Sequence, residues 1–169
     1  MRATPRVVVV MGVSGTGKTT VGTLLAEALG VPYAEADDFH SSANIAKMSA
    51  GVPLDDEDRA PWLDAIGAWA HEHSGPGAHG GVVSCSALKR AYRDRLRQAA
   101  PDLFFVHLTG DHDLIAERMA ARQGHFMTAK LLDSQFATLE PLQPDEPGIA
   151  LDITPDPAVI TGQALAALR

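Results

Sequence analysis

Residues 12–19, GVSGTGKT, fit the phosphate-binding pattern G-x-x-x-x-G-K-[ST] and restrict the chain to few folds. The segment RVVVVM at residues 6–11, which is apolar from Val7 onward, precedes the loop, and apolar residues at helical spacing follow it over residues 18–29. A buried strand, a glycine loop and a helix in this order let backbone N–H groups converge on a phosphate at the helix N-terminus. An ordinary glycine-rich turn would require neither flank, so we interpret residues 12–19 as a P-loop.

The chemistry expected of this P-loop is ATP binding. Lys18 would reach the β- and γ-phosphates and neutralise charge during catalysis, and the Thr19 hydroxyl would bind Mg²⁺. The predicted ATP-binding residues of the loop are Gly12, Val13, Ser14, Gly15, Thr16, Gly17, Lys18, Thr19 and Thr20. The motif indicates a nucleotide site but does not specify a reaction.

Two sequence segments that would identify other nucleotide-binding proteins do not occur. Guanine specificity usually comes with N-K-x-D, whereas the only asparagine, Asn44, lies in N-I-A-K. The third expected strand ends in VVSC, without the aspartate that many ATPases use to organise Mg²⁺. The site must therefore take its acidic groups from elsewhere in the chain.

Glu35, Asp37 and Asp38 are the candidate acidic groups, and Glu35 and Asp37 are the two that are given roles. They follow the second expected strand, at the carboxyl edge of an open parallel sheet beside the P-loop, and strand alternation would send both to one side. We predict that Asp37 accepts or orients the proton of an attacking hydroxyl, and that Glu35 helps to hold the water shell of Mg²⁺. The alternative is a solvated acidic turn.

The rest of the chain alternates between strand and helix patterns. Strands are expected at 6–11, 32–36, 81–85, 103–108 and 149–153, and further helices at 42–48, 88–99, 113–122, 129–139 and 158–168. Another helix is expected to be capped by Asp58 or a neighbour and to carry Pro61 in its first turn. These elements predict one α/β domain over residues 1–169, a P-loop NTPase three-layer sandwich with a five-stranded parallel sheet.

Composition excludes several classes of function. A net charge of −7 argues against broad binding to nucleic acid or a membrane surface, because both are negatively charged. The apolar run near the N-terminus is far shorter than the ~18 residues of a membrane span. Cys85 is the only cysteine, which fits a reducing compartment. We expect a soluble cytoplasmic protein that acts on a small molecule.

Long segments of the sequence resemble the P-loop gluconokinases, which are related to shikimate and nucleoside monophosphate kinases. The matching segments are MGVSGTGKTT, DDFHSSANIAKMSAGVPLDDEDRAPWL, CSALKRAYRDRLR, ARQGHFM and LLDSQFATLEPL. The resemblance implies transfer of the γ-phosphoryl group of Mg²⁺·ATP to D-gluconate, giving 6-phosphogluconate. Glu35 and Ser41 stand where aspartate and proline are common in the family.

Other activities remain as alternatives to this interpretation. The nearest is another small-molecule P-loop kinase, such as a shikimate-like or nucleotide kinase. A regulatory ATPase is disfavoured, because an acceptor-binding segment and a lid would have no evident use in it. Relatives in the family are often dimers, so a homodimer is possible, although no surface stripe in the sequence indicates one.

The resemblance implies a helical acceptor-binding segment at about residues 38–73. Gluconate carries a carboxylate and several hydroxyls, so its site should combine cations with hydrogen-bonding side chains. The predicted substrate-binding residues are Asp37, His40, Lys47, Arg59, Lys89 and Arg93. Arg59 is the preferred carboxylate clamp, since its planar guanidinium binds both oxygens. Lys89 and Arg93 are four residues apart and could point into one cleft, or belong to a solvated basic face.

A lid is implied at about residues 118–130. Arg118 and Arg122 are four apart on a helix that runs into Gln123-Gly124-His125-Phe126, as in the lids of small kinases. Such a lid would close over ATP, exclude water and stabilise the transferring charge. By resemblance, Arg118 would lie nearer the base and the catalytic Arg122 nearer the phosphates. The alternative is ordinary charge on a helix surface.

Two further features are interpreted as structural. His71, His73 and His79 invite a metal assignment, but two share a helix at unsuitable spacing and the third lies in a glycine loop, so solvated histidines are expected. Cys85 follows a buried strand with no histidine and acidic partner implied, so we expect a core or pocket-wall residue.

Overall fold

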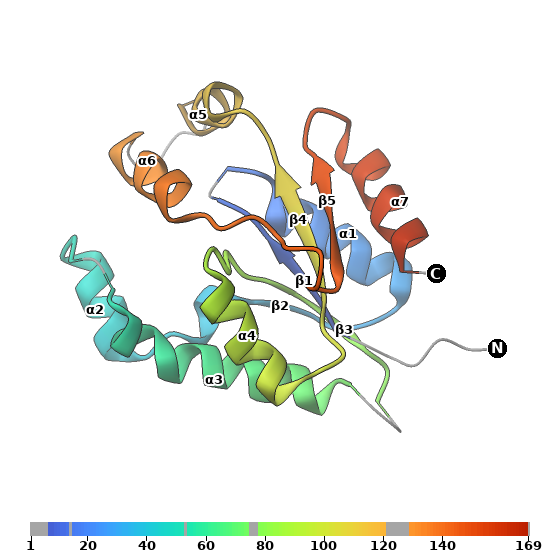
Figure 1. Cartoon of the computed structure of the whole chain (residues 1–169), viewed down its shortest axis with the longest axis horizontal. Coiled ribbons are helices and arrows are strands. Elements are labelled where there is room, and N and C mark those ends of the chain that lie inside the picture. Colours follow the sequence, from blue (N-terminus) through green and yellow to red (C-terminus); the bar gives the residue numbers. More distant parts are fainter. Residues whose placement is uncertain (1–6, 14, 53, 75–77, 121–128, 169) are drawn as a thin grey trace.

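Five parallel strands form one sheet in the order β2-β3-β1-β4-β5 (Figure 1). The computed structural model describes residues 7–13, 15–52, 54–74, 78–120 and 129–168. The strands are β1 Val7–Met11, β2 Tyr33–Glu35, β3 Gly81–Ser84, β4 Phe104–Thr109 and β5 Gly148–Asp152. The five-stranded parallel sheet expected from the sequence is therefore confirmed.

Helices cover both faces of this sheet. They are α1 Lys18–Leu29, η1 Ala36–Phe39 (a 3₁₀ turn), α2 Ser42–Ser49, α3 Asp56–Glu72, α4 Arg90–Ala99, α5 His112–Ala120, α6 Ala129–Thr138 and α7 Pro157–Ala167. Helices α1 and α7 pack on one face, and α3 and α4 on the other (Figure 1). Helices α2, α5 and α6 lie toward the carboxyl ends of the strands, where the sequence predicts the site.

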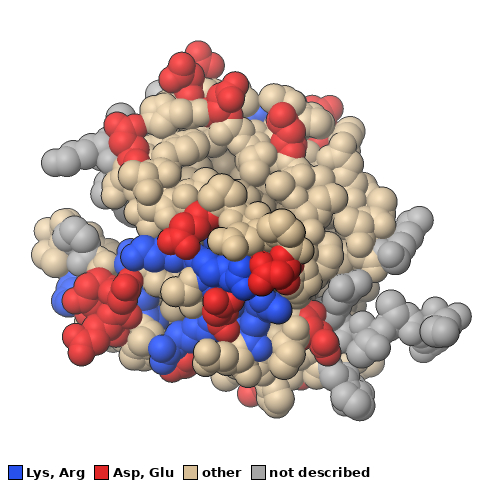
Figure 2. Space-filling view, in the orientation of Figure 1, with Lys and Arg blue, Asp and Glu red and all other residues tan. Residues whose placement is uncertain are grey.

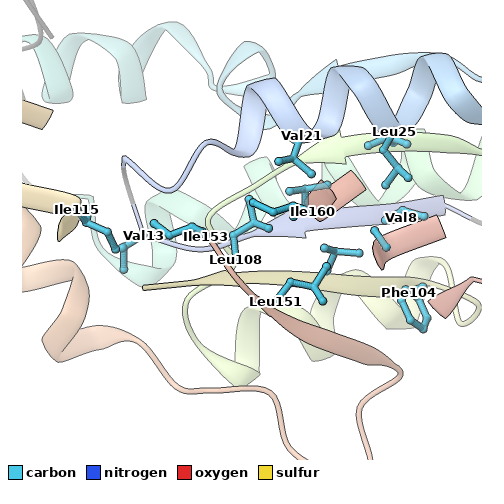
Figure 3. Close-up of a cluster of buried hydrophobic side chains, with 14 of the residues drawn as sticks. Val8, Val13, Val21, Leu25, Phe104, Leu108, Ile115, Leu151, Ile153 and Ile160 are labelled. Atoms are coloured by element: carbon cyan, nitrogen blue, oxygen red, sulfur yellow. The ribbon is translucent and has the colours of Figure 1, made fainter. Parts of the chain in front are cut away.

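The alternation of β1 divides the core into two layers. Val8 and Val10 pack with Leu25 of α1 and Ile160 of α7 (Figure 3). Val7, Val9 and Met11 face the opposite layer, which contains Trp62, Ile66 and Leu96 from α3 and α4. Because both faces are covered, the P-loop follows a strand that is fixed on each side.

Helix α3 begins earlier than its proline suggests. Asp55 is the N-cap, with its side chain accepting from Asp58 N at 2.7 Å, while Asp58 Oδ2 accepts from Asp55 N at 3.1 Å. This reciprocal capping box satisfies two otherwise unpaired donors. The helix therefore starts at Asp56, and the expectation that Pro61 lies in its first turn is wrong. Pro61 lies inside the helix.

In the part of the chain that the structure describes, no helix is both long enough and apolar enough to cross a membrane.

Candidate active site

The loop between β1 and α1 has the backbone geometry of a phosphate cradle. Gly15 and Gly17 adopt φ of 84° and 89°, in the left-handed region that favours glycine. A Cβ at Gly12 would lie 2.8 Å from Leu108 O, so close packing also requires a glycine there. A Cβ at Gly17 would meet nothing within 4 Å, so this N-cap of α1 borders open space. Ser14 lies outside the described residues.

Lys18 is held against the start of this loop. Its Nζ donates to Gly12 O at 2.8 Å, and the buried Thr16 hydroxyl donates to Val13 O at 2.9 Å. Burial lowers the pKa of Lys18, while the charges of Asp37 and Glu35 oppose that shift. Both predicted acidic residues therefore lie within electrostatic range of the P-loop lysine. Thr20 is exposed in the first turn of α1.

The two predicted Mg²⁺-binding residues are in direct contact. Thr19 Oγ1 donates to Glu35 Oε1 at 2.6 Å. The Tyr33 hydroxyl donates to the same oxygen at 2.6 Å and lies 2.7 Å from Ser84 Oγ. Burial and the bond to Glu35 raise the pKa of Tyr33 to about 12, so this phenol remains protonated and keeps donating. A hydroxyl and a carboxylate oxygen side by side fit the oxygen ligands that Mg²⁺ prefers.

Tyr33 and Ser84 were not among the predicted site residues. Ser84 ends β3, close to the position where an aspartate was sought in VVSC, and its hydroxyl donates to Lys18 O at 3.0 Å. The absence of that aspartate was the available signal. It indicated that the acidic group of the site comes from the neighbouring strand, as Glu35. In the structure, Ser84 at the end of β3 contacts the Tyr33 hydroxyl, and this hydroxyl donates to Glu35.

Asp37 lies in η1, where strand alternation has ended, so the expected alternation of Glu35 and Asp37 is wrong. Asp37 is exposed, and His40 follows with its ring stacked on Trp62 at 4.4 Å between centroids. Burial and the charge of Arg59 lower the pKa of His40, while the charge of Asp37 opposes this shift. The charges of the predicted base and of the predicted carboxylate clamp therefore both act on His40.

Arg59 and Lys89 lie around one tyrosine ring. Arg59 Nη1 donates to Tyr92 Oη at 3.2 Å, and that hydroxyl donates to Asp56 Oδ1 at 2.7 Å. Lys89 Nζ lies 5.4 Å from the Tyr92 ring centroid and 3.5 Å from Asp56 Oδ1. The structure thus brings together two predicted substrate-binding cations from α3 and the start of α4. Tyr92 and Asp56 were not among the predicted site residues. The available signal was the position of Tyr92, three residues after Lys89 in the same predicted helix.

Lys47 is tied to α3 by an ion pair. Its Nζ donates to Asp58 Oδ1 at 2.9 Å and to Oδ2 at 2.8 Å. The bond to Asp58 raises the pKa of Lys47, so the ammonium group remains charged. Lys47 thus shares its charge with a carboxylate, and its predicted contact with the acceptor stays a prediction.

Arg93 does not lie where it was predicted. Its side chain has no exposed surface, and its five N–H groups have partners inside the protein. Nε and Nη2 donate to Glu146 at 2.6 and 3.0 Å, and the remaining N–H groups donate to Ala87 O, Leu88 O and Pro141 O. No donor is left for a substrate. The idea that Lys89 and Arg93 point into one cleft is therefore wrong for Arg93, because the buried Glu146 draws the guanidinium into the protein.

Glu146 remains ionised in this pair. Burial raises its pKa, but bonds from Arg93 and from Gln143 N outweigh that effect and leave the pKa lowered. Glu146 belongs to the segment before β5, so the pair fastens α4 to a distant part of the chain.

Removing Arg93 is expected to destabilise the fold. Arg93→Ala would leave the Glu146 charge buried without its partner, which should lower the free energy of unfolding by about 3–5 kcal/mol. Urea denaturation followed by circular dichroism measures this loss. The matched control is Arg95→Ala, since the Arg95–Asp64 pair is exposed and should contribute much less. Equal losses in the two variants would contradict a structural role for Arg93.

The other arginines of α4 form ion pairs near the surface, where Arg95 is exposed and Arg90 and Arg97 are partly buried. Figure 2 shows basic side chains interleaved with acidic ones over this part of the molecule. Arg90 pairs with Asp145 at 2.7 Å, and Arg95 pairs with Asp64 at 2.8 Å. These pairs balance the charge of this surface.

Part of the predicted lid lies outside the described residues, and Arg122 is among the residues not described. Arg118 lies in the last turn of α5, where its Nη2 donates to Ile153 O at 3.1 Å, just after β5. The predicted contact of Arg118 with ATP stays a prediction.

The histidines predicted to be solvated are exposed or partly exposed. His71 and His79 are exposed, and the partly exposed His73 stacks on Trp69 at 4.1 Å between centroids. Among the described residues, no group of three or more His, Cys, Asp or Glu side chains could hold a metal ion. Burial raises the pKa of Cys85 to about 12, so its thiol is an inert core group, as expected.

Comparisons with known proteins agree with this geometry. Residues 8–134 match the family model described as an AAA domain. The chain is similar to a gluconokinase of Gluconobacter oxydans (strain 621H), with 51% identity covering 92% of this chain and 87% of that protein. It is also similar to the thermosensitive gluconokinase of Escherichia coli (strain K12), with 45% identity covering 92% and 83%.

Solved structures give the same result. The crystal structure of a gluconokinase from Sinorhizobium meliloti 1021 matches with a TM-score of 0.88 and 49% identity, covering 99% of this chain and 93% of that chain. The APS kinase CysC of Mycobacterium tuberculosis matches with a TM-score of 0.70 at 18% identity, which shows a shared fold alone.

Proposed function

The chain belongs to the gluconokinase family, and from this premise we propose that it transfers the γ-phosphoryl group of ATP to a hydroxyl of gluconate at the carboxyl edge of its sheet. One observation supports the placement above all. Glu35 accepts from Thr19 of the P-loop, and the next residue, Ala36, accepts from Trp62 of α3. The turn that carries Asp37 therefore lies between the P-loop and the acceptor-binding segment.

The proposed mechanism is an in-line displacement. The P-loop residues Gly12–Thr20 bind the phosphates through backbone N–H groups, and Lys18 neutralises charge that develops on the transferred group. Asp37 accepts the proton of the attacking hydroxyl, and the oxygen of that hydroxyl bonds to the γ-phosphorus. The bond from that phosphorus to the bridging oxygen breaks, and ADP leaves with the electron pair. Arg118 and Arg122 are proposed to contact ATP from the lid.

The acceptor is proposed to lie along η1 and α3. Arg59 binds the carboxylate of gluconate, while His40, Lys47 and Lys89 contact its other oxygens. Support comes from Tyr92, which joins Arg59 to the Lys89–Asp56 pair and so places two positive groups near one another. Two cations match one carboxylate surrounded by hydroxyls.

Mg²⁺ is proposed as the metal cofactor. Thr19 would bind it directly, and Glu35 would hold its water shell. When bound, the ion would draw charge from the β- and γ-phosphates. The contact between Thr19 Oγ1 and Glu35 Oε1 supports this proposal, because it places a hydroxyl and a carboxylate oxygen side by side at the P-loop.

The alternative of a shikimate-like or nucleotide kinase receives no support. The shikimate kinase of Aquifex aeolicus shares 14% identity with a TM-score of 0.56, a likeness of fold only. The relatives above 40% identity described here are gluconokinases.

An acceptor panel tests the proposed reaction. ADP formation would be measured with ATP, Mg²⁺ and one acceptor at a time: gluconate, other sugar acids, shikimate or a nucleoside monophosphate. We expect turnover with gluconate and almost none with shikimate or nucleotides, because the oxygens of those molecules are not arranged to contact both Arg59 and Lys89. Hydrolysis of ATP at one rate with every acceptor would instead indicate an ATPase.

We further propose that the reaction takes place in the cytoplasm, where ATP is abundant, and that the protein forms a homodimer as family members often do. Cys85 as a buried free thiol is compatible with a reducing compartment. Light scattering of the purified protein would give the mass of the particle in solution.

A further inference from the structure

Asn44 is a buried polar residue that the proposed mechanism does not use. It lies on α2, and only 4% of its surface is exposed, although its chain neighbours on α2 are largely exposed. Its Nδ2 atom has two contacts: Asp58 O at 2.9 Å and His40 Nδ1 at 3.3 Å. These two contacts determine which way the Asn44 amide is turned and which ring nitrogen of His40 carries a proton.

The contact with Asp58 fixes the orientation of the amide. A backbone carbonyl oxygen can only accept, so the atom of Asn44 that faces Asp58 O must be the nitrogen. That nitrogen carries a second hydrogen, which is directed at His40 Nδ1. Nδ1 must therefore present a lone pair, and the proton of a neutral His40 is on Nε2.

The ring of His40 is held in this position. It stacks on Trp62 with an angle of 9° between the planes. Trp62 is itself buried, and its Nε1 donates to Ala36 O at 2.7 Å. Stacking fixes the plane of the imidazole, and the bond from Asn44 selects which ring edge faces α2.

Burial favours the neutral form of His40, and the charged groups around the ring act in opposite directions. Asp37 on η1 favours protonation, and Arg59 on α3 opposes it. Asp58, whose backbone oxygen contacts Asn44, is paired with Lys47, so these two charges are opposite and close together. Burial has the largest effect and Arg59 adds to it, so the pKa of His40 is lowered although Asp37 opposes the shift.

We propose that Asn44 is a positioning residue that holds His40 in the Nε2–H tautomer, so that Nε2 donates to an oxygen of the acceptor. This inference rests on the proposed function. Carboxylate oxygens of gluconate can only accept, and the hydroxyl that gives its single proton to Asp37 can likewise only accept from a second neighbour. A donor at Nε2 suits both, whereas a lone pair there would repel them.

Asn44→Asp tests the tautomer. A carboxylate at this position accepts from Nδ1–H, so neutral His40 would have no proton on Nε2. At pH 8 we expect the KM for gluconate to rise about threefold to tenfold, the effect of one hydrogen bond, with the KM for ATP unchanged. Near pH 6 the adjacent carboxylate keeps His40 protonated on both nitrogens. Nε2–H then returns, and the KM should recover toward the wild-type value.

The control is Asn44→Ala, which removes the bond without imposing the other tautomer and should show no comparable recovery at low pH. A merely structural defect in Asn44→Asp would raise the KM equally at pH 6 and pH 8, and that result would overturn the proposal.

A second measurement requires no variant. The ¹⁵N chemical shifts of the His40 ring in the wild-type protein at pH 7 should show a protonated Nε2 and an unprotonated Nδ1. The reverse assignment would overturn the inference even if Asn44→Asp failed to fold. If the wild-type protein did not phosphorylate gluconate, the proposed function would fail, while the chemical shifts would still decide the tautomer.

Discussion

Asp37→Asn is expected to lower kcat with gluconate by about 10²–10⁴-fold, the range typical for loss of a general base. The asparagine keeps the size of the side chain but cannot accept the proton of the attacking hydroxyl. The KM for ATP should change little, because the P-loop holds the nucleotide. Steady-state kinetics with saturating ATP and varied gluconate measure both quantities.

The matched control for this variant is Asp38→Asn. Asp38 is exposed and lies next to Asp37 in the same 3₁₀ turn, so it loses the same charge at almost the same place. We expect this control to retain nearly full kcat. If Asp37→Asn also retained full turnover, the role of base would be excluded for Asp37, and the acidic turn would only be a solvated one.

Lys18→Met is expected to lower kcat by about 10²–10³-fold, as removal of one preorganised charge stabiliser does. Methionine matches the length of the lysine stem but brings no charge to the transferring phosphoryl group. It also removes the bond from Nζ to Gly12 O, so affinity for ATP should fall as well. Kinetics give kcat, and titration calorimetry with ATP gives the affinity.

Arg95→Met serves as the control for the loss of a positive charge, because Arg95 pairs with Asp64 at the surface. Its kcat should stay close to that of the wild-type protein. A Lys18→Met protein with kcat within about threefold of wild type would contradict the proposed stabilisation, since a single such group contributes far more than that.

Sequence patterns predict the sheet and the P-loop of this protein well, because both depend on local rules. Five strands and most helix bounds follow from apolar periodicity, and the loop follows from glycines between a buried strand and a helix. The start of α3 was harder to place. Both Asp55 and Asp58 can cap a helix, and the capping box uses both of them.

The part of the site that sequence could not predict depends on partners distant along the chain. Arg93 and Lys89 share a helical spacing, yet Glu146, 53 residues after Arg93, draws only one of them into the core. Asp56 and Tyr92 are 36 residues apart and meet only because α3 packs on α4. Spacing along one helix cannot show which side chain finds such a partner.

The contacts of Asp58 with α2 affect how α2 and the start of α3 move. Its carboxylate accepts from Lys47 and from Asp55 N, and its backbone oxygen accepts from Asn44. Two links from α2, those of Lys47 and Asn44, therefore reach the first turn of α3 through one residue, and these two segments should shift together as a rigid body. If the acceptor binds where we propose, gluconate would meet a preorganised surface, and less of its binding energy would be lost in ordering the protein.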